Sequence, residues 1–135
     1  MKLPTILALA PLVTANPVKR TNSCGVSTFE NRISNGSPSV ADCQQLAYNI
    51  RGDGSWNHVG NPGQHRTLAT FGTCAFGVEA DPHFGRQSAF RVGNEDIIDL
   101  IRDSISLYQG DGRVGTRGIM MCGNTQVLWG IYHTK

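Results

Sequence analysis

The sequence predicts an α+β domain in which two helices pack on one face of an antiparallel β-sheet, held by two disulfides. Three observations lead to this fold class. Helical and alternating patterns follow one another along the chain, four cysteines are spread over it, and 120 of the 135 residues remain once an apolar leader of 15 is set aside. That length suits one domain with one core. The order of the patterns favours antiparallel strands with the helices on one side.

The first fifteen residues, MKLPTILALAPLVTA, predict a secretory signal peptide. One positive charge, at Lys2, precedes a short apolar run that ends in small residues. The run is shorter than the roughly 20 apolar residues that cross a bilayer, and no later stretch is apolar enough to do so. We expect cleavage between Ala15 and Asn16 and a secreted, extracellular protein.

A leader, residues 16–23, precedes the domain predicted for residues 24–135. It contains the dibasic pair Lys19-Arg20. In a secretory pathway that contains a dibasic endoprotease, such a pair invites cleavage, so we predict processing after Arg20. The alternative is two solvated charges in a disordered tail.

The charge balance argues against a nucleic-acid partner. The chain has 12 Lys and Arg against 10 Asp and Glu, a net charge of +2. Removal of residues 1–15 leaves 11 basic residues and a net charge of +1, and removal of residues 1–20 leaves 9 and −1. This lacks the basic footprint of proteins that bind nucleic acid or anionic membranes. We expect no nucleic acid and no stable membrane anchoring.

The segment before the first helix predicts a short strand near residues 26–32, VSTFENR, followed by a loop. The loop contains Asn35-Gly36-Ser37, a sequon that predicts N-glycosylation of Asn35. Pro38 after the sequon lowers its expected occupancy, and Asn-Gly is also an ordinary turn pair.

Residues 37–50, SPSVADCQQLAYNI, predict the first helix. Pro38 suits the first turn, and Ser39 with Asp42 resembles a capping box. Apolar residues at positions 40, 43, 47 and 50 form one face, which carries Cys43.

The middle of the chain predicts strands. Residues 67–80, TLATFGTCAFGVEA, alternate as one strand and place Cys74 on the more apolar side. Residues 55–59, SWNHV, and 88–92, SAFRV, predict shorter strands.

Residues 93–108, GNEDIIDLIRDSISLY, predict the second helix. Asn94 is a good N-cap, and acids in the first turn suit the helix dipole. The expected buried stripe is Ile97, Ile101, Ile105 and Tyr108, and the expected solvated face carries Glu95, Asp96, Asp99 and Asp103.

The C-terminal residues predict a hairpin of TRGIMMC, 116–122, and QVLWGIYH, 126–133. Trp129 and Tyr132 fall on opposite sides of the second strand, so one can lie in the core and the other at the surface. An exposed aromatic would be a candidate anchor for a partner.

Both helices are followed by Gly-Asp-Gly. The first triplet completes Arg51-Gly52-Asp53, the tripeptide of integrin ligands, and the second is Gly110-Asp111-Gly112. The Gly-Asp-Gly triplet also follows the second helix, where no arginine precedes it. We therefore interpret Arg51-Gly52-Asp53 as the end of a helix in which Gly52 is left-handed.

Four cysteines in a secreted chain predict two disulfides. Cys43 and Cys74 both lie on faces that point between helix and sheet, which favours Cys43–Cys74 nested inside Cys24–Cys122. This face argument leaves one alternative open, because Cys122 could also meet Cys43.

No residue pattern indicates a metal site or a cofactor. The cysteines are too widely spaced for zinc, and the histidines show no metal-ligand spacing. One enzymatic alternative remains, a small ribonuclease-like hydrolase, for which one loop-rich region supplies the residue types of a general acid, a general base and a phosphate ligand: His65, Arg66, Glu79, His83 and Arg86.

Five segments resemble the domain of the fungal extracellular-protein-two effectors, also known as the necrosis-inducing-factor family: SVADCQQLAYNI, TLATFGTCAFGV, VGNEDIIDLIRDSI, GRVGTRGIMMCG and VLWGIYHT. The resemblance runs from about Cys24 to Thr134, and all four cysteines match. It implies secretion, a role against a plant host or a competing microbe, and an α/β-sandwich similar to the KP-four type killer toxins. The family has no established enzyme activity, so the resemblance implies no catalytic residues.

The sequence therefore predicts a monomeric secreted effector that is not an enzyme and acts on a host or microbial surface or protein. The hydrolase of the His65 to Arg86 region is the alternative.

Overall fold

The computed structural model describes residues 20–58, 62–83 and 89–135. The predicted signal peptide, its cleavage site between Ala15 and Asn16, and Lys19 lie outside the described residues, as does Arg86. Arg20 is the first described residue and is exposed. Signal cleavage, dibasic processing and glycosylation of Asn35 stay predictions.

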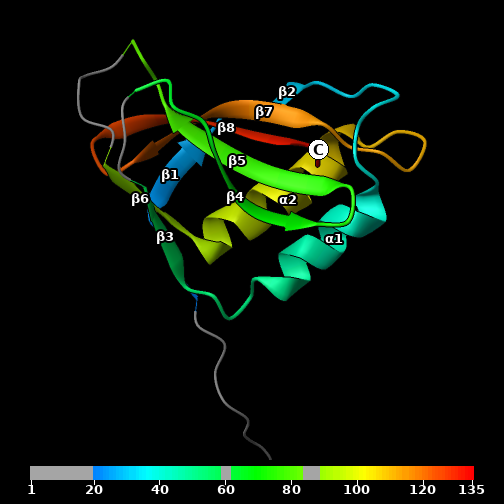
Figure 1. The fold of residues 1–135 in the computed structure, drawn as a ribbon, viewed down its shortest axis with the longest axis horizontal. Coiled ribbons are helices and arrows are strands. Elements are labelled where there is room, and N and C mark those ends of the chain that lie inside the picture. Colours follow the sequence, from blue (N-terminus) through cyan, green and yellow to red (C-terminus); the bar gives the residue numbers. More distant parts are fainter. Residues whose placement is uncertain (1–19, 59–61, 84–88) are drawn as a thin grey trace, which may run out of the picture.

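The described strands form a larger and a smaller sheet, both antiparallel (Figure 1). The larger sheet has the order β1-β7-β8-β5-β4, with β2 also paired to β7, and the smaller sheet pairs β3 with β6. The strands are β1 (Cys24–Ser27), β2 (Glu30–Asn31), β3 (Ser55–His58), β4 (Arg66–Phe71), β5 (Cys74–Ala80), β6 (Phe90–Gly93), β7 (Thr116–Cys122) and β8 (Thr125–His133).

Both helices, α1 (Val40–Asn49) and α2 (Asn94–Tyr108), lie on the same side of the larger sheet (Figure 1). The predicted α+β fold with two helices on one face is confirmed. The core lies between these layers. Alternate residues of β5, beginning at Cys74, are fully buried there against Ile97 and Ile101 of α2. The opposite side of the sheet carries no helix of the described chain, and we call it the helix-free face (Figure 1).

The nested disulfide pairing is confirmed. Cys43 on α1 is bonded to Cys74 on β5, and Cys24 on β1 is bonded to Cys122 on β7. Cys24 and Cys122 are also direct cross-strand partners, so the outer bridge fastens an edge strand to its neighbour. The inner bridge joins the helix layer to the sheet.

The predicted single strand over residues 67–80 is wrong, because these residues form the hairpin β4–β5. Gly72 has φ +54°, in the left-handed region, so the chain reverses at Gly72-Thr73. The alternation continues after the turn, and Cys74, Phe76 and Val78 share the buried side as predicted. Alternation alone does not reveal a two-residue turn inside a periodic run.

The predicted first-helix cap is present, since the Ser39 hydroxyl accepts a hydrogen bond from the Asp42 amide at 3.1 Å. The cap predicted for the second helix is displaced by one residue. Gly93 occupies the N-cap position, and Asn94 donates its side-chain amide to the carbonyls of Ile50 and Arg51 at 3.1 and 2.6 Å. Asn94 thus joins the start of α2 to the end of α1.

Asp96 does not lie on the solvated face of α2. It is buried, and its carboxylate accepts hydrogen bonds from the amides of Gly93 and Ser23 at 2.8 and 2.7 Å. The carboxylate therefore closes the first turn of α2 and holds the chain that enters β1.

A Gly-Asp-Gly triplet follows each helix, and in each triplet the left-handed glycine is the second one. Gly54 and Gly112 have φ +86° and +75°, whereas Gly52 is not in the left-handed region and has no heavy atom near the position of an added side chain. The prediction of a left-handed Gly52 is wrong. Arg51 stacks its guanidinium 4.0 Å from the centroid of the Tyr48 ring.

Candidate functional site

The helix-free face has one row of cross-strand partners that runs over four strands and reaches β2. In order, its residues are Thr67 on β4, Gly77 on β5, Gly130 on β8, Arg117 on β7 and Glu30 on β2. Two adjacent glycines at the centre of the row leave a strip of sheet with no side chains of its own.

A chain of polar side chains lies over that strip. The Tyr132 hydroxyl is 2.6 Å from His65 Nε2 and 2.7 Å from Thr67 Oγ1. On the other side of the imidazole, His65 Nδ1 is 3.7 Å from Glu79 Oε1. We call Glu79, His65, Tyr132 and Thr67 the relay, because each contacts the next in that order.

The local fold explains why these four side chains meet. Tyr132 is paired with Ala75, and its side chain leans diagonally over Gly130 to reach Gly77. A carbon added at Gly130 would lie 3.5 Å from Tyr132 Cδ2, and one added at Gly77 would lie 2.6 Å from His65 Cε1 and in contact with the Tyr132 hydroxyl. The relay in this position therefore depends on glycine at position 77, whereas the distance at Gly130 is an ordinary van der Waals contact.

Tyr132 stays protonated at physiological pH. Burial raises the pKa of its phenol, although the hydrogen bond with Thr67 lowers it in part. A protonated hydroxyl has one hydrogen to donate. It thus donates to one of His65 and Thr67 and accepts from the other, if both bonds form together.

Of the five residues predicted for a hydrolase, the structure brings together two, His65 and Glu79. Arg66 instead donates to the Asn57 carbonyl at 2.9 Å, and His83 lies 3.1 Å from the Asp81 carboxylate. The structure does not describe Arg86.

The sequence left Tyr132 as one of two candidate anchors and did not connect it with His65, and it did not indicate Thr67 at all. The available signal was the opposite placement of Trp129 and Tyr132, which is confirmed: Trp129 is buried and Tyr132 is half-buried on the other side. Thr67 gave no signal, because only its pairing with Gly77 places it beside the tyrosine.

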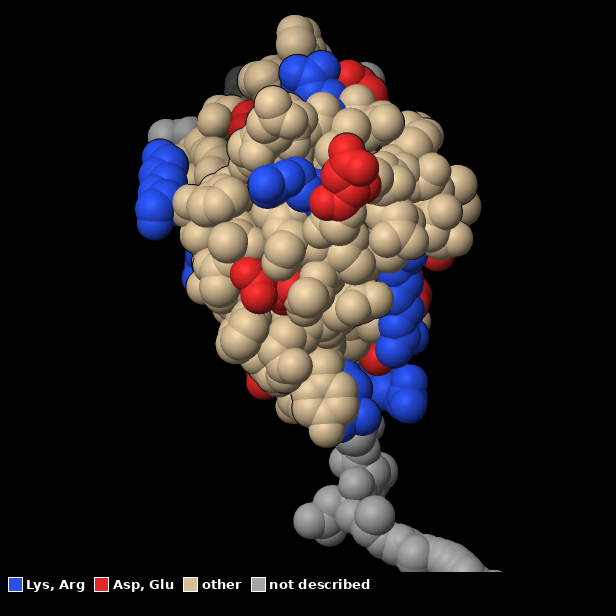
Figure 2. Space-filling view, turned by 90° about the vertical axis from the view of Figure 1, so that its right-hand side faces the viewer, with Lys and Arg blue, Asp and Glu red and all other residues tan. Residues whose placement is uncertain are grey.

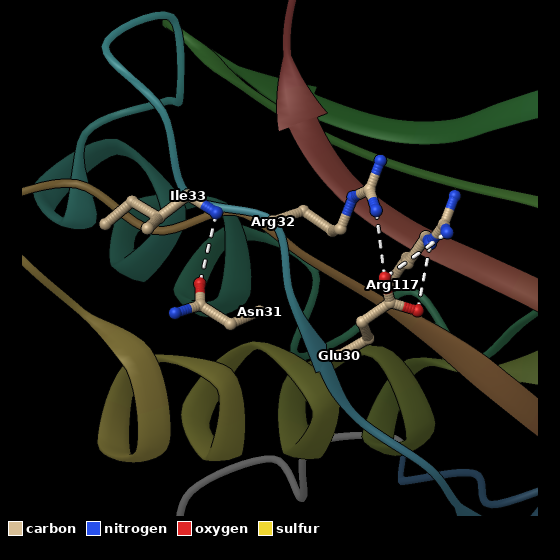
Figure 3. A network of polar contacts seen from close by, with 5 residues as sticks. All are labelled: Glu30, Asn31, Arg32, Ile33 and Arg117. Atoms are coloured by element: carbon tan, nitrogen blue, oxygen red, sulfur yellow. Dashed lines mark hydrogen bonds and ion pairs between the residues drawn. The ribbon is translucent and has the colours of Figure 1, made fainter.

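The end of the row at β2 carries an ion-pair network (Figure 3). Glu30 accepts two hydrogen bonds from Arg117, both 3.3 Å, and one from Arg32 at 2.9 Å. Arg117, followed by Arg32, lowers the pKa of the Glu30 carboxyl. One carboxylate therefore faces two guanidinium groups at this edge of the sheet.

A second surface feature lies between the helices. A groove of about 430 Å³ is lined by Tyr48 and Arg51 of the α1 end and by Ile101, Arg102 and Ile105 of α2, together with Gln44 and Ala47. It lies on the helix layer and is separate from the relay.

Charged side chains of both signs are scattered over a mostly uncharged surface on the side of the molecule that Figure 2 shows. Within residues 20–58, 62–83 and 89–135, no helix is long and apolar enough to cross a membrane. The same residues hold no group of three or more His, Cys, Asp and Glu side chains arranged to bind a metal ion.

Two curated relatives, both from Penicillium expansum, are named as chitinases. The chain is 38% identical over 122 residues to "Probable chitinase LysM18" and 34% identical over 112 residues to "Secreted chitinase LysM12". These matches cover 87% and 78% of this chain but 8% and 7% of the relatives. The chain thus spans less than a tenth of the length of the relatives it matches.

These names overturn the prediction that the protein is not an enzyme. The prediction rested on the absence of a recognisable catalytic motif and on a resemblance without established activity. The relatives' names point instead to an enzymatic setting.

A family model matches residues 23–122, from just before Cys24 to Cys122. The family is Hce2, described as "Pathogen effector; putative necrosis-inducing factor". The match confirms the resemblance to the extracellular-protein-two effectors, while the similarity to killer toxins stays a prediction. The chain belongs to the Hce2 family of pathogen effectors.

Proposed function

We propose that this chain is a secreted effector that acts on chitin-containing cell walls, and that the helix-free face is its working surface. The observation that carries the proposal is the relay of Glu79, His65, Tyr132 and Thr67 on that face. A family of secreted effectors and two relatives named as chitinases support the class of target.

The relay has features of a working site more than of a structural one. The strands beneath it are already held by their backbone ladders and by the core on the other side. The side chains of His65 and Glu79 remain 47% and 28% exposed. Exposed hydrogen bonds of this kind add little to stability, so their organisation points to a ligand.

Hydrolysis by this chain is a second candidate, which the order carboxylate, imidazole, hydroxyl favours. In that reading His65 transfers a proton and Glu79 stabilises the charged imidazole, as in acid–base catalysis generally. A glycosidase of the usual kind needs two carboxylates that face the scissile bond. The relay contains one.

Binding and hydrolysis are tested together with the purified chain and insoluble chitin. We expect the chain to sediment with chitin, and His65→Ala to weaken this by about fivefold or more. If the wild-type chain releases soluble oligosaccharides from chitin and His65→Ala does not, the chain also hydrolyses chitin, which is the second candidate function. Equal recovery of wild type and His65→Ala on chitin, or no recovery of wild type, contradicts the proposal.

Secretion and the identity of the target organism need separate experiments. The N-terminus of protein recovered from fungal culture medium should be Asn16, or Thr21 if the dibasic pair is processed. Leaf infiltration beside growth tests on filamentous fungi separates the two victims: necrosis supports a plant target and growth arrest a microbial one. Retention of the chain inside the cells contradicts the secretion part of the proposal.

A further inference from the structure

The Tyr132 ring is half-buried on the helix-free face, above the two glycines of the row. The ring edge lies over Gly130, and its hydroxyl lies over Gly77, which is the diagonal neighbour on the next strand. Neither glycine has a side chain that could cover the ring, and Tyr132 is half-buried, so part of the ring is open to solvent.

The relay holds the ring in that position. His65 and Thr67 contact the hydroxyl from two sides, at 2.6 and 2.7 Å. The His65 ring lies beside the tyrosine with centroids 5.4 Å apart and planes inclined by 56°. An aromatic ring fixed before binding loses little conformational entropy on contact with a ligand.

A flat, uncharged aromatic face next to hydrogen-bonding groups suits a pyranose ring. The π-face of tyrosine carries negative charge density, which attracts the polarised C–H groups on one face of a sugar. Glu79 and His65, both partly exposed beside the ring, can bond hydroxyl or amide groups at the rim of the sugar. A sugar unit within a chain has neighbours that also need room. The row from Thr67 to Arg117 provides about 14 Å of sheet at about 4.8 Å per strand.

We propose that Tyr132 is the stacking platform for a sugar unit of a β-linked N-acetylglucosamine chain, with His65 and Thr67 as positioning residues and Glu79 as a hydrogen-bond acceptor for the sugar. This inference rests on the proposed function for the identity of the sugar. The position of the Tyr132 side chain between His65, Thr67 and the two glycines comes from the structure.

The test is a titration of the purified chain with chitin oligosaccharides, followed by NMR or calorimetry. We expect Tyr132→Leu to weaken binding by about tenfold, since the apolar bulk remains and the π-face is lost. Tyr132→Phe keeps the aromatic ring but loses the hydroxyl that His65 and Thr67 contact, so it should weaken binding less than Tyr132→Leu does. Tyr48→Leu is the matched control, because Tyr48 is an exposed tyrosine on the helix layer, and it should bind as wild type does.

Thermal melting of each variant shows whether it folds. If Tyr132→Leu does not fold, the chemical shifts of the Tyr132 ring protons in wild type give the answer, because a stacked sugar must perturb them more than those of Tyr48. Binding unchanged in folded Tyr132→Leu, or equal perturbation of both tyrosines, overturns the platform.

A second oligosaccharide separates this inference from the proposed function. Glucose oligomers with the same β-linkage lack the N-acetyl group. Binding of these alone, with loss in Tyr132→Leu, would support the platform and contradict the chitin target. Binding of chitin oligomers that does not depend on Tyr132 would support the target and overturn the platform.

Discussion

His58 is a buried imidazole without a hydrogen-bond partner for either ring nitrogen among the described residues. Its ring packs 4.9 Å from that of Phe90. Burial, with a smaller effect of Arg66, lowers the pKa of His58 below its usual value near 6.5. The unfolded chain therefore takes up the proton first as the pH falls.

This depressed pKa predicts that acid destabilises the fold through His58. The contribution of neutral His58 to stability is fully present above about pH 6.5, and it is lost as the pH drops from there toward the folded-state pKa. His58→Phe should reduce the difference between melting temperatures at pH 7.5 and pH 5. The exposed His133→Gln should not reduce it, and a difference that is the same in His58→Phe and wild type would show that other groups cause the acid sensitivity.

Two glycines of the sheet should respond differently to alanine. A methyl group at Gly77 would meet the ends of the His65 and Tyr132 side chains, which can move aside. A methyl group at Gly118 would meet the Thr28 backbone carbonyl and lie 2.8 Å from Trp129 Nε1. Gly118→Ala should therefore lower stability by about 1–3 kcal/mol or more, measured by denaturant unfolding. Gly77→Ala should cost less but displace the relay and weaken chitin binding. Equal stability losses in the two variants would contradict this account of the sheet.

At the scale of elements, the end of one helix is joined to the turn of a hairpin. Asp42 of α1 accepts hydrogen bonds from the amide and hydroxyl of Thr73 at 2.8 and 2.7 Å, and the Thr73 hydroxyl also accepts from the Ser39 amide at 3.0 Å. The bonds from Thr73 lower the pKa of Asp42. The Cys43–Cys74 disulfide lies beside these contacts.

We predict that Asp42→Asn lowers the melting temperature at pH 7, and that the deficit relative to wild type shrinks in acid. The reason is that a carboxyl with a depressed pKa stabilises the fold above its unfolded pKa near 3.8 and loses that contribution as it is protonated. Gln45→Glu, on the exposed side of the same helix, is a control for a change of charge. A deficit for Asp42→Asn that is constant from pH 7 to pH 2.5 would contradict the prediction.

The sequence predicted elements where a pattern is local and failed where long-range contacts decide. The apolar faces of α1 and α2 follow from spacing, and so does the pairing of Cys43 with Cys74. The turn at Gly72, the role of Asn94 and the burial of Asp96 do not. The side chain of Asn94 bonds carbonyls more than 40 positions away, and the carboxylate of Asp96 bonds the Ser23 amide 73 positions away. The relay could not be predicted for the same reason, because Tyr132 contacts His65 and Thr67, which lie 67 and 65 positions before it in the chain.

At the scale of the whole molecule, two nested disulfides both stabilise a fold with a small core. The outer bridge closes a separation of 98 residues and the inner one a separation of 31. In the chain-entropy model these bridges stabilise the fold by about 4.7 and 3.7 kcal/mol. Domains are usually stable by about 5–15 kcal/mol, so each bridge is a large part of the total.

The two bridges also differ in what they join, which makes their loss distinguishable. Cys43 and Cys74 are fully buried between helix and sheet, so Cys43→Ala/Cys74→Ala adds a cavity to the entropic loss. Cys24 is half-buried on edge strand β1. In Cys24→Ala/Cys122→Ala this strand gains local motion in the folded state, and that gain offsets part of the stability lost with the bridge. We therefore expect removal of the inner bridge to lower stability at least as much as removal of the outer one, against the order of loop lengths.

Denaturant unfolding measures both losses, and hydrogen exchange should show faster exchange confined to β1 in the outer-bridge variant. A clearly larger loss for the outer bridge would mean that chain entropy alone sets the order.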